Sequence, residues 1–384
     1  MTFETVKGFR DIEDASKRNQ IRDIIEKTFK LYNFIPVETP VVEYEEFVRG
    51  NNSSDKAVSD IFKLLDRGER KLALRYEFTF QLKRLSQNKK LPYKRYEMGY
   101  VFRDEPASGN RWRQFTQCDC DIIGSSLRDE AEILKIVSEI LEKLNIKFVI
   151  NFNNRKLLNE ILEKLNIEEK NREQVIREID KLDKLTEKEV KQNLSKYNAE
   201  KALEIFNKDE KYFEKYENYK EISELKKLCS LYGIKLNFSP FLARGLSYYN
   251  GSVFEIKSDL KETISAGGSY LVNGIQSTGI SFGLDRLEIL SKLKSEENKV
   301  LVISLGEDKV AIELSDKIRN CGISSSVMYG KPGKALDYAN SYFIKYVLFV
   351  GEDEVKKKKF KLKNMTSGKE QFLNLKDLLL AVTK

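Results

Sequence analysis

The first third of the chain combines one helical pattern with several extended runs. Apolar residues recur at helical spacing within residues 14–31, and an extended stretch containing two prolines follows at 34–42. Residues 72–76, 95–103 and 112–124 have strand character, and a polar, turn-rich stretch separates the last two. Strands joined by a local loop predict antiparallel pairing, so we expect an antiparallel sheet with a flanking helix.

The pattern changes in the middle of the chain. Residues 154–229 are rich in Lys, Glu, Leu, Ile and Asn and contain neither proline nor glycine, which predicts a helical insertion. Strand character returns at 236–239, 252–256 and 279–282, and the last of these leads into a predicted helix at 285–293. The insertion is therefore expected to interrupt the sheet.

The end of the chain has a pattern of its own. A charged linker precedes apolar strands at 300–305 and 346–350, which alternate with predicted helices at 309–320 and 334–343. This alternation predicts a separate, small α/β domain with a mixed or parallel sheet. Its basic run at 356–359, which continues with two further lysines, either contacts RNA phosphates or only solvates an edge strand.

The composition fits a globular chain of two or three domains. With 384 residues, of which 41% are hydrophobic and 33% charged, the chain is too long for one compact core and too apolar for disorder. Its apolar runs are too short to span a bilayer, and residues 1–10 lack the apolar core of a signal peptide. Four cysteines do not make a disulfide framework at this length, so we expect a cytoplasmic protein with no membrane partner.

Two features of charge bear on function. The formal net charge of +8 permits a polyanionic partner without requiring one, because lysine-rich solvated helices give the same value. The chain contains no histidine, which removes the commonest general base and the commonest metal-binding imidazole. Catalysis must then depend on arginine, carboxylates, hydroxyls or the substrate's own groups.

Three arginine-bearing segments carry the candidate chemistry. In the first, Arg103 ends a strand, a polar loop follows, and Arg111 and Phe115 come after the loop. Guanidinium groups can fork onto phosphate oxygens while an aromatic ring stacks on a base, so this segment suits a nucleoside triphosphate. A solvated hairpin with ordinary surface arginines explains the same pattern.

The other two segments also have a structural alternative. Residues 279–286 place small residues at alternate strand positions and put Arg286 in the first turn of a helix, where a cation is unfavourable unless it serves a ligand. A tightly packed strand–helix junction gives the same pattern. Residues 244–251 begin with Arg244 and place Tyr248 and Tyr249 before a glycine turn, which fits a hairpin with cross-strand aromatic packing equally well.

Together, and in their order along the chain, the segments resemble motif 2, the histidine-specific motif and motif 3 of histidyl-tRNA synthetases of the archaeal and eukaryotic style. The resemblance covers nearly the whole chain. Further stretches that resemble the family, including its dimer-forming motif 1 and its amino-acid-binding segment, lie at residues 7–11, 38–40, 74–79, 117–124, 179–185 and 338–354.

The resemblance implies an α+β class II synthetase catalytic domain (an antiparallel sheet flanked by helices) with a helical insertion and a C-terminal α/β anticodon-binding domain. It places the two parts of the catalytic domain at 1–152 and 231–294, the insertion at 153–230 and the anticodon-binding domain at 299–384. The implied activity is ATP-dependent ligation of L-histidine to its cognate tRNA through a histidyl-adenylate, with Mg²⁺, by a homodimer.

The resemblance also assigns roles to residues. It implies that Arg103 and Arg244 are catalytic and act on the α-phosphate and the carboxylate. The implied ATP-binding residues are Arg103, Glu105, Arg111, Phe115 and Arg286. The implied histidine-binding residues are Glu77, Thr79, Gln117, Asp121, Arg244, Tyr248 and Tyr249. No residue is assigned to a protein-bound metal. Because the attacking carboxylate is already ionised, adenylation needs fixed cations and Mg²⁺ rather than a general base, which suits a chain without histidine.

Some positions depart from the family pattern. Ser247 stands where an aspartate is usual, and Ser269 follows two glycines where an arginine is common, so the usual roles of those side chains cannot be carried over. Cys118 and Cys120 share one face of a strand, which suggests metal binding. Buried apolar cysteines are the better interpretation, because no histidine or second nearby cysteine pair completes such a site.

Two other functions are compatible with this fold. One is the regulatory subunit of the first histidine-biosynthesis enzyme, a catalytically silent paralogue that typically lacks the anticodon domain and the ATP arginines. The other is a synthetase-like accessory factor that binds nucleic acid without chemistry. The retained arginines and residues 300–384 argue against the first, and the complete histidine pocket argues against the second.

Overall fold

The chain divides into two compact units, residues 1–293 and 294–384, each with its own hydrophobic core. The computed structural model describes residues 3–50, 56–107, 111–183, 185–244, 248–258, 263–293 and 299–383. Most of the predicted charged linker, residues 294–298, lies outside these ranges. Within them, no helix combines the length and apolarity needed to cross a membrane.

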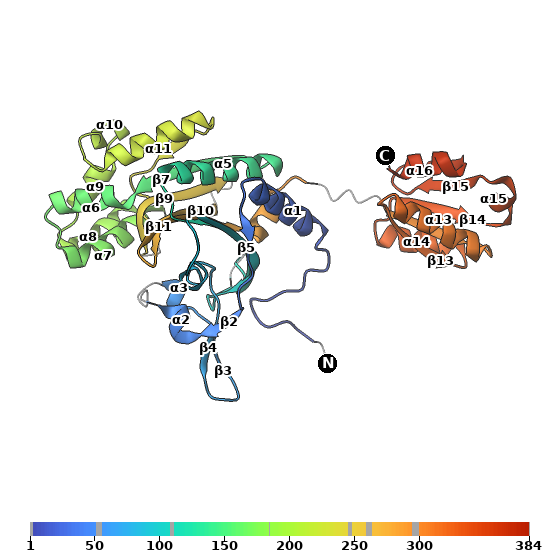
Figure 1. The fold of residues 1–384 in the computed structure, drawn as a ribbon, viewed down its shortest axis with the longest axis horizontal. Helices are drawn as coiled ribbons and strands as arrows, with labels where there is room; N and C mark the ends of the chain where they lie inside the picture. Colours follow the sequence, from blue (N-terminus) through green and yellow to red (C-terminus); the bar gives the residue numbers. More distant parts are fainter. Residues whose placement is uncertain are drawn as a thin grey trace. The chain divides into compact units, whose positions relative to one another are not determined.

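An eight-stranded sheet forms the centre of the first unit (Figure 1). In spatial order its strands are β1 (Ile35–Pro36), β5 (Tyr93–Phe102), β6 (Gln114–Ile123), β11 (Ile275–Gly283), β10 (Thr263–Val272), β9 (Tyr249–Ser258), β7 (Phe148–Asn154) and β8 (Leu236–Phe238). The outermost pairs, β1–β5 and β7–β8, are parallel, and all pairs between them are antiparallel. The predicted antiparallel sheet is confirmed.

Helices cover one face of this sheet. They are α1 (Ser16–Leu31), α5 (Leu127–Lys143), α11 (Tyr219–Leu231) and α12 (Leu284–Leu290). Figure 1 shows α11 beside α5. The helical spacing of apolar residues in α1 puts Ile21, Ile25 and Phe29 on one side, and they are fully buried in the same core as Cys118 and Cys120 of β6. Because side chains alternate along a strand, the intervening residues of β6 face the opposite side of the sheet.

The predicted helical insertion is present between β7 and β8. Its elements are α6 (Arg155–Lys164), α7 (Glu169–Ile179), the 3₁₀ turn η1 (Asp180–Asp183), α8 (Glu187–Leu194), the 3₁₀ turn η2 (Ser195–Tyr197), α9 (Lys201–Phe206), α10 (Glu210–Phe213) and α11. Local side-chain caps mark the starts of α6 and α8. The Asn154 side chain accepts from the backbone N–H of Lys156 at 2.8 Å, and Thr186 with Glu189 forms a capping box at α8. These helices share the main core of the first unit.

A small second sheet was not predicted. It contains β2 (Val42–Tyr44), β4 (Lys71–Leu74) and β3 (Lys63–Leu65), and the short helices α2 (Glu45–Arg49), α3 (Lys56–Ser59) and α4 (Leu82–Leu85) lie in the same part of the chain. The strand expected at 72–76 ends at Leu74 because it pairs only with these short neighbours. The chain beyond β4 is thereby left free of sheet pairing to line the pocket described below.

The second unit is the predicted α/β domain with a mixed sheet. Its strands, in spatial order, are β13 (Ser324–Tyr329), β12 (Lys299–Ser304), β14 (Tyr346–Val350), β15 (Phe360–Asn364) and β16 (Glu370–Leu373). Its helices are α13 (Asp308–Asn320), α14 (Pro332–Ser341), α15 (Glu352–Lys357) and α16 (Leu375–Thr383). The first three strands are mutually parallel, and β15 and β16 are added in antiparallel fashion.

Candidate active site

One pocket of about 1240 Å³ lies on the side of the large sheet opposite α1 and α5, and the first turn of α12 reaches its wall. Strands β6, β9, β10 and β11 form its floor, and the helical insertion contributes to its wall. All twelve residues expected in the active site line it, namely Glu77, Thr79, Arg103, Glu105, Arg111, Phe115, Gln117, Asp121, Arg244, Tyr248, Tyr249 and Arg286. Residues more than 200 positions apart in the sequence therefore converge on one cavity.

One end of the pocket is formed by buried polar side chains. Glu77 is enclosed, and the Tyr248 hydroxyl donates to it at 3.4 Å. Burial raises the pKa of Glu77 to about 7, and the charge of Arg103 opposes the rise. Burial also raises the pKa values of Tyr248 and Tyr249, which keeps both hydroxyls neutral. A cationic ligand group beside Glu77 would restore its carboxylate form.

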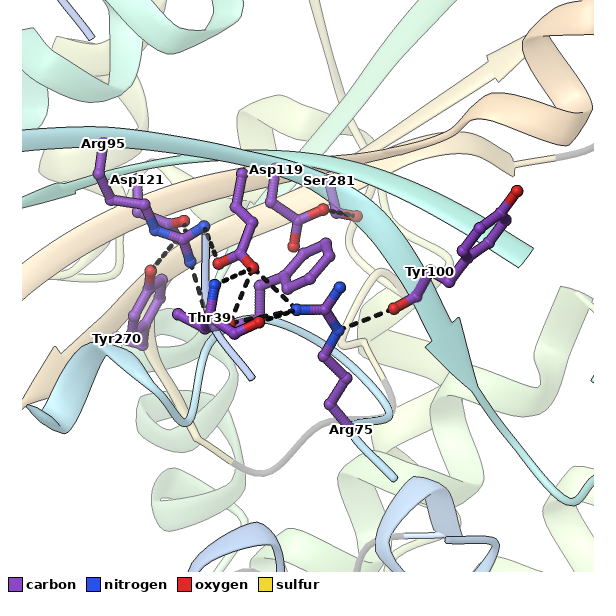
Figure 2. Close-up of polar contacts among 10 residues, drawn as sticks. Thr39, Arg75, Arg95, Tyr100, Asp119, Asp121, Tyr270 and Ser281 are labelled. Atoms are coloured by element: carbon purple, nitrogen blue, oxygen red, sulfur yellow. Dashed lines mark hydrogen bonds and ion pairs between the residues drawn. The ribbon is translucent and has the colours of Figure 1, made fainter. Parts of the chain in front are cut away.

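Asp121 is held rigidly at the same end. The fully buried guanidinium of Arg95 pairs with its Oδ2 atom at 2.8 Å, and the Tyr270 hydroxyl donates to its Oδ1 atom. Figure 2 shows these three side chains meeting beneath the sheet. A Cβ atom on Gly279 would lie 1.9 Å from Asp121 Oδ1, so only glycine at this position leaves room for the carboxylate.

Arg95 also connects this end of the pocket to the segment before β2. Glu97 lies beside it on β5 and accepts from Arg75 at 2.9 Å and from the Thr39 hydroxyl at 2.7 Å. Arg75 in turn donates to the carbonyls of Thr39 and Tyr100, as Figure 2 shows. The network fixes the position of the chain around β4, which leads directly to Glu77.

A second hydrogen-bond chain crosses from β6 to β11. Gln117 donates to the Ser281 hydroxyl at 2.7 Å, and Ser281 donates to Asp119 at 2.5 Å. Burial raises the pKa of Asp119 well above its usual value. Gln117 thereby keeps its orientation, while its buried Oε1 atom has no hydrogen-bond partner among the described residues. A buried acceptor without a partner, on a residue that lines the pocket, is consistent with a ligand donor at this point.

Arginines surround the other end of the pocket. Arg103 donates from Nε to the Tyr76 carbonyl at 3.2 Å, and its guanidinium lies over the Phe115 ring, 5.1 Å from the centroid. Arg111 lies 3.9 Å from Glu105 at the exposed rim. Positive charge and an aromatic face are thus adjacent, as the nucleotide hypothesis requires.

Arg244 and Arg286 approach from the opposite wall. Arg244 lies 3.4 Å from Glu255 on β9, and Lys257 on the same strand lies 3.3 Å from the other oxygen of that carboxylate. Arg286 donates to the backbone carbonyl of Thr263, whose hydroxyl donates to Glu255 at 2.5 Å. Arg244 and Lys257 are therefore positioned by the Glu255 carboxylate, and Arg286 by the Thr263 carbonyl.

Asp285 anchors this wall from beneath. It accepts from Arg10 at 2.8 Å, from Arg18 at 2.9 Å and from the backbone N–H of Thr116 at 3.1 Å. Burial alone would raise the pKa of Asp285, but the Thr116 N–H and the charge of Arg18 together lower it. Because Arg10 also lies over the Trp112 ring at 4.7 Å, the N-terminal segment supports both arginine-bearing walls.

The sequence interpretation missed several pocket residues. Asp119, Asp180, Glu255 and Lys257 line the cavity but were not singled out. The alternation of strand residues could have found three of them, since Asp119 lies between Gln117 and Asp121 at strand spacing, and Glu255 and Lys257 follow Tyr249 at even intervals. Asp180 reaches the pocket from the insertion, and its only sequence signal was its place in the 179–185 stretch that resembles the family.

The two departures from the family pattern have different outcomes. Ser247 lies outside the described residues. Ser269 is buried and donates to Glu130 of α5 at 2.5 Å, away from the pocket lining. Cys118 and Cys120 are fully buried among apolar side chains of the core, and burial raises both thiol pKa values.

Comparison with known proteins identifies the family. A family model described as histidyl-tRNA synthetase matches residues 8–287, and one described as anticodon binding domain matches residues 299–384. Histidine--tRNA ligase 1 of Bacillus cereus is 34% identical, with 98% of this chain and 97% of the relative aligned. Histidine--tRNA ligase 2 of Shouchella clausii is 31% identical over 96% of this chain and 97% of its own.

A solved structure agrees with the sequence relatives. The crystal structure of histidyl-tRNA synthetase from Nostoc sp. PCC 7120 superposes with a TM-score of 0.86 at 27% identity, covering 100% of this chain and 99% of that one. The family model accounts for most of the first unit and the anticodon-binding model for the second. The chain therefore belongs to the histidyl-tRNA synthetase family of class II aminoacyl-tRNA synthetases, and it ligates histidine to tRNA.

Proposed function

We propose that the large pocket of the first unit is where histidine reacts with ATP to form a histidyl-adenylate. The observation that carries this proposal is the convergence of all twelve expected residues on one cavity, with buried polar groups at one end and arginines at the other. Glu77, Thr79, Gln117 and Asp121, with Tyr248 and Tyr249, hold histidine. Arg103, Glu105, Arg111, Phe115 and Arg286 hold ATP.

The chemistry proposed for the pocket needs no general base. The histidine carboxylate attacks the α-phosphorus of ATP, and the bond from that phosphorus to the β-phosphate oxygen breaks to release pyrophosphate. Negative charge builds on phosphate oxygens, so the useful groups are cations fixed before the reaction begins. Arg103 and Arg244 supply that charge at the reacting phosphate and carboxylate, held by Tyr76 and Glu255 respectively. The adenylate then passes histidine to tRNA.

Mg²⁺ fits this arrangement as a companion of the nucleotide. Carboxylate oxygens are the ligands it prefers, and it is usually shared between one or two carboxylates and substrate phosphates. Glu105 and Glu255 line the pocket beside the arginines proposed for phosphate, so they are the residues that would hold it. When bound, Mg²⁺ neutralises phosphate charge. Arg111 lies 3.9 Å from Glu105, and Arg244 and Lys257 lie 3.4 Å and 3.3 Å from Glu255.

We also propose how the second unit contacts tRNA. Exposed aromatic rings on and after α14 suit stacking on unpaired bases, and Tyr338 and Tyr342 are in ring contact with centroids 4.5 Å apart. The alternative that the lysines of the basic run only solvate an edge strand does not hold for Lys361 and Lys363. Their strand, β15, lies between β14 and β16 and is not at the edge, and both lysines pair with Glu370. Lys356 and Lys357 lie on α15, paired within the helix.

A reducing cytoplasm fits the cysteines. Cys118, Cys120 and Cys229 are buried and Cys321 is exposed, and all four are free. Secretion into an oxidising compartment, detected by cell fractionation, would contradict a cytoplasmic location.

The motif 1 region is proposed to form a homodimer. Leu31, Ile35, Val42 and Tyr44 are exposed apolar residues, and β1 is an edge strand of the large sheet. An exposed apolar edge is covered in most stable proteins. Sedimentation of the full chain at micromolar concentration should give twice the monomer mass, and a monomer under those conditions would contradict the proposal.

Replacing the proposed catalytic cation should abolish most adenylation. Arg244→Ala removes charge acting on the transition state, so histidine-dependent pyrophosphate exchange should fall by roughly 10²–10³-fold in kcat, with the fold retained. Arg128→Ala is the matched control, because Arg128 is an exposed arginine outside the pocket lining. If Arg244→Ala instead raised only the KM for histidine, Arg244 would be a binding residue and its assignment to phosphate charge would be wrong.

Histidine binding should be linked to proton release from Glu77. With the pKa of the free enzyme's Glu77 raised to about 7, the carboxyl is about half protonated at pH 7, and the ligand's ammonium group requires the carboxylate. Calorimetry of histidine binding in buffers of different ionisation enthalpy counts the protons released. Wild type should release about half a proton more per bound histidine than Glu77→Gln does. The imidazole of the ligand titrates equally in both proteins, so the difference isolates Glu77.

Equal proton counts in the two proteins would contradict this assignment. Stability provides an independent check. Because the folded pKa of Glu77 lies above its ordinary value of 4.5, wild type should lose stability as pH rises from about 4.5 through about 7. Glu77→Gln should lack that loss.

Removing the second unit should separate formation of the histidyl-adenylate from the transfer of histidine to tRNA. A chain ending at residue 293 should retain pyrophosphate exchange, because all the pocket residues lie in the first unit. It should charge tRNA poorly, and its tRNA binding should depend less steeply on salt, since fewer phosphate contacts are lost. A truncated chain that charges tRNA as well as the full chain would show that this domain serves another purpose.

A further inference from the structure

The loop that leads to Arg244 is held by side chains from outside it. Asn153, at the end of β7, is fully buried and donates to the carbonyls of Pro240 and Leu242, each at 3.0 Å. Arg155, the first residue of α6, donates to the carbonyl of Ala243 at 3.5 Å. These contacts fix the carbonyl groups of the loop but not its N–H groups.

Asp180 of the insertion holds the N–H groups. Its Oδ1 atom accepts from the backbone N–H of Ala243 at 3.2 Å and of Arg244 at 3.0 Å. Two consecutive peptide N–H groups thus point at one carboxylate oxygen, 63 and 64 residues away in sequence. Hydrogen bonds to a charged acceptor are the stronger kind, so Asp180 is the principal restraint on this part of the backbone.

Arg244 needs such a restraint because its backbone is strained. Its φ angle is +63°, in the left-handed region that residues with a Cβ atom seldom adopt. This conformation costs an arginine on the order of 1 kcal/mol, and it persists only where surrounding contacts impose it. The contacts that impose it here are those from Asp180 to the N–H of Arg244 itself and of the residue before it.

The side chain of Arg244 is held far less firmly than its backbone. Its one ion pair among the described residues is the 3.4 Å contact with Glu255, and its buried Nε atom has no hydrogen-bond partner there. The direction of the guanidinium is therefore set mainly from the backbone. Asp180 itself lines the pocket, as do Ile179 and Leu182 beside it, so this turn of the insertion is part of the site wall.

We propose that Asp180 is a positioning residue for adenylation, which holds Arg244 in its left-handed conformation so that the guanidinium enters the pocket before substrates bind. The inference rests on the proposed catalytic role of Arg244. It gives the insertion a part in the first half-reaction, before any tRNA is present. If Asp180 had a purely structural role, replacing it would lower the stability of the protein without acting through Arg244.

The test uses the full chain and a double-mutant cycle. Asp180→Ala and Asp180→Leu remove the acceptor, while Asp180→Asn keeps an oxygen that can accept. The acceptor-free variants should lower kcat for histidine-dependent pyrophosphate exchange about 10–100-fold, with KM for ATP and histidine changed less than about threefold. Asp180→Asn should recover most of the loss. Asp209→Ala, which removes a helix-capping acceptor of the same insertion away from the pocket, should leave kcat unchanged.

The decisive comparison is made in the Arg244→Ala background. Because Asp180 acts through Arg244, adding Asp180→Ala to Arg244→Ala should produce no further loss of kcat. Independent, multiplying losses would overturn the proposal, and so would an Asp180→Ala variant as active as wild type. The two acceptor-free variants guard against a folding failure of either one, which a thermal melt would reveal.

Failure of the underlying assignment gives a different result. If Arg244→Ala retained full exchange, Arg244 would not be catalytic and the positioning role would fall with it. If Arg244→Ala lost exchange while both acceptor-free variants at 180 kept it, only the positioning role would be wrong.

Discussion

The buried guanidinium of Arg95 is the constraint on which the rest of the site depends. It is fully enclosed, so its charge must be compensated, and the compensation comes from Asp121 on β6 and Glu97 on β5. Glu97 carries the network on to Arg75 and to Thr39. One buried cation therefore fixes both the base of the buried polar end of the pocket and the chain that leads to Glu77. Removing it would leave uncompensated carboxylates under the pocket.

The same principle, charge fixed before the substrate arrives, explains how a chain without histidine can catalyse the reaction. Each cation at the proposed nucleotide end contacts a group of the protein: Arg103 the Tyr76 carbonyl, Arg286 the Thr263 carbonyl, and Arg244 the Glu255 carboxylate. At the opposite end, burial leaves Glu77 close to half protonated at neutral pH. We therefore propose that the pocket offers fixed positive charge to phosphates and an adjustable carboxyl to an ammonium group.

Much of this could be predicted from the sequence, and the failures have physical reasons. The arginine-bearing segments, and the family resemblance that they carry, implied twelve site residues that the fold brings together. The strand β4 was predicted, but the small sheet that it forms with β2 and β3 was missed because those two strands are too short to show a period. Asp180 lies in the 179–185 stretch that resembles the family, but its role was missed because its contact with Arg244 spans 64 residues and cannot be read from the local sequence. The left-handed φ of Arg244 is likewise a product of tertiary contacts.

The central claim is that this pocket activates histidine with ATP by means of fixed cations. Exchange of labelled pyrophosphate into ATP by the full chain, with each of the twenty amino acids supplied in turn, tests it most directly. The account predicts exchange that requires histidine and proceeds without tRNA. Exchange that is absent, or that is supported equally by other amino acids, would contradict it.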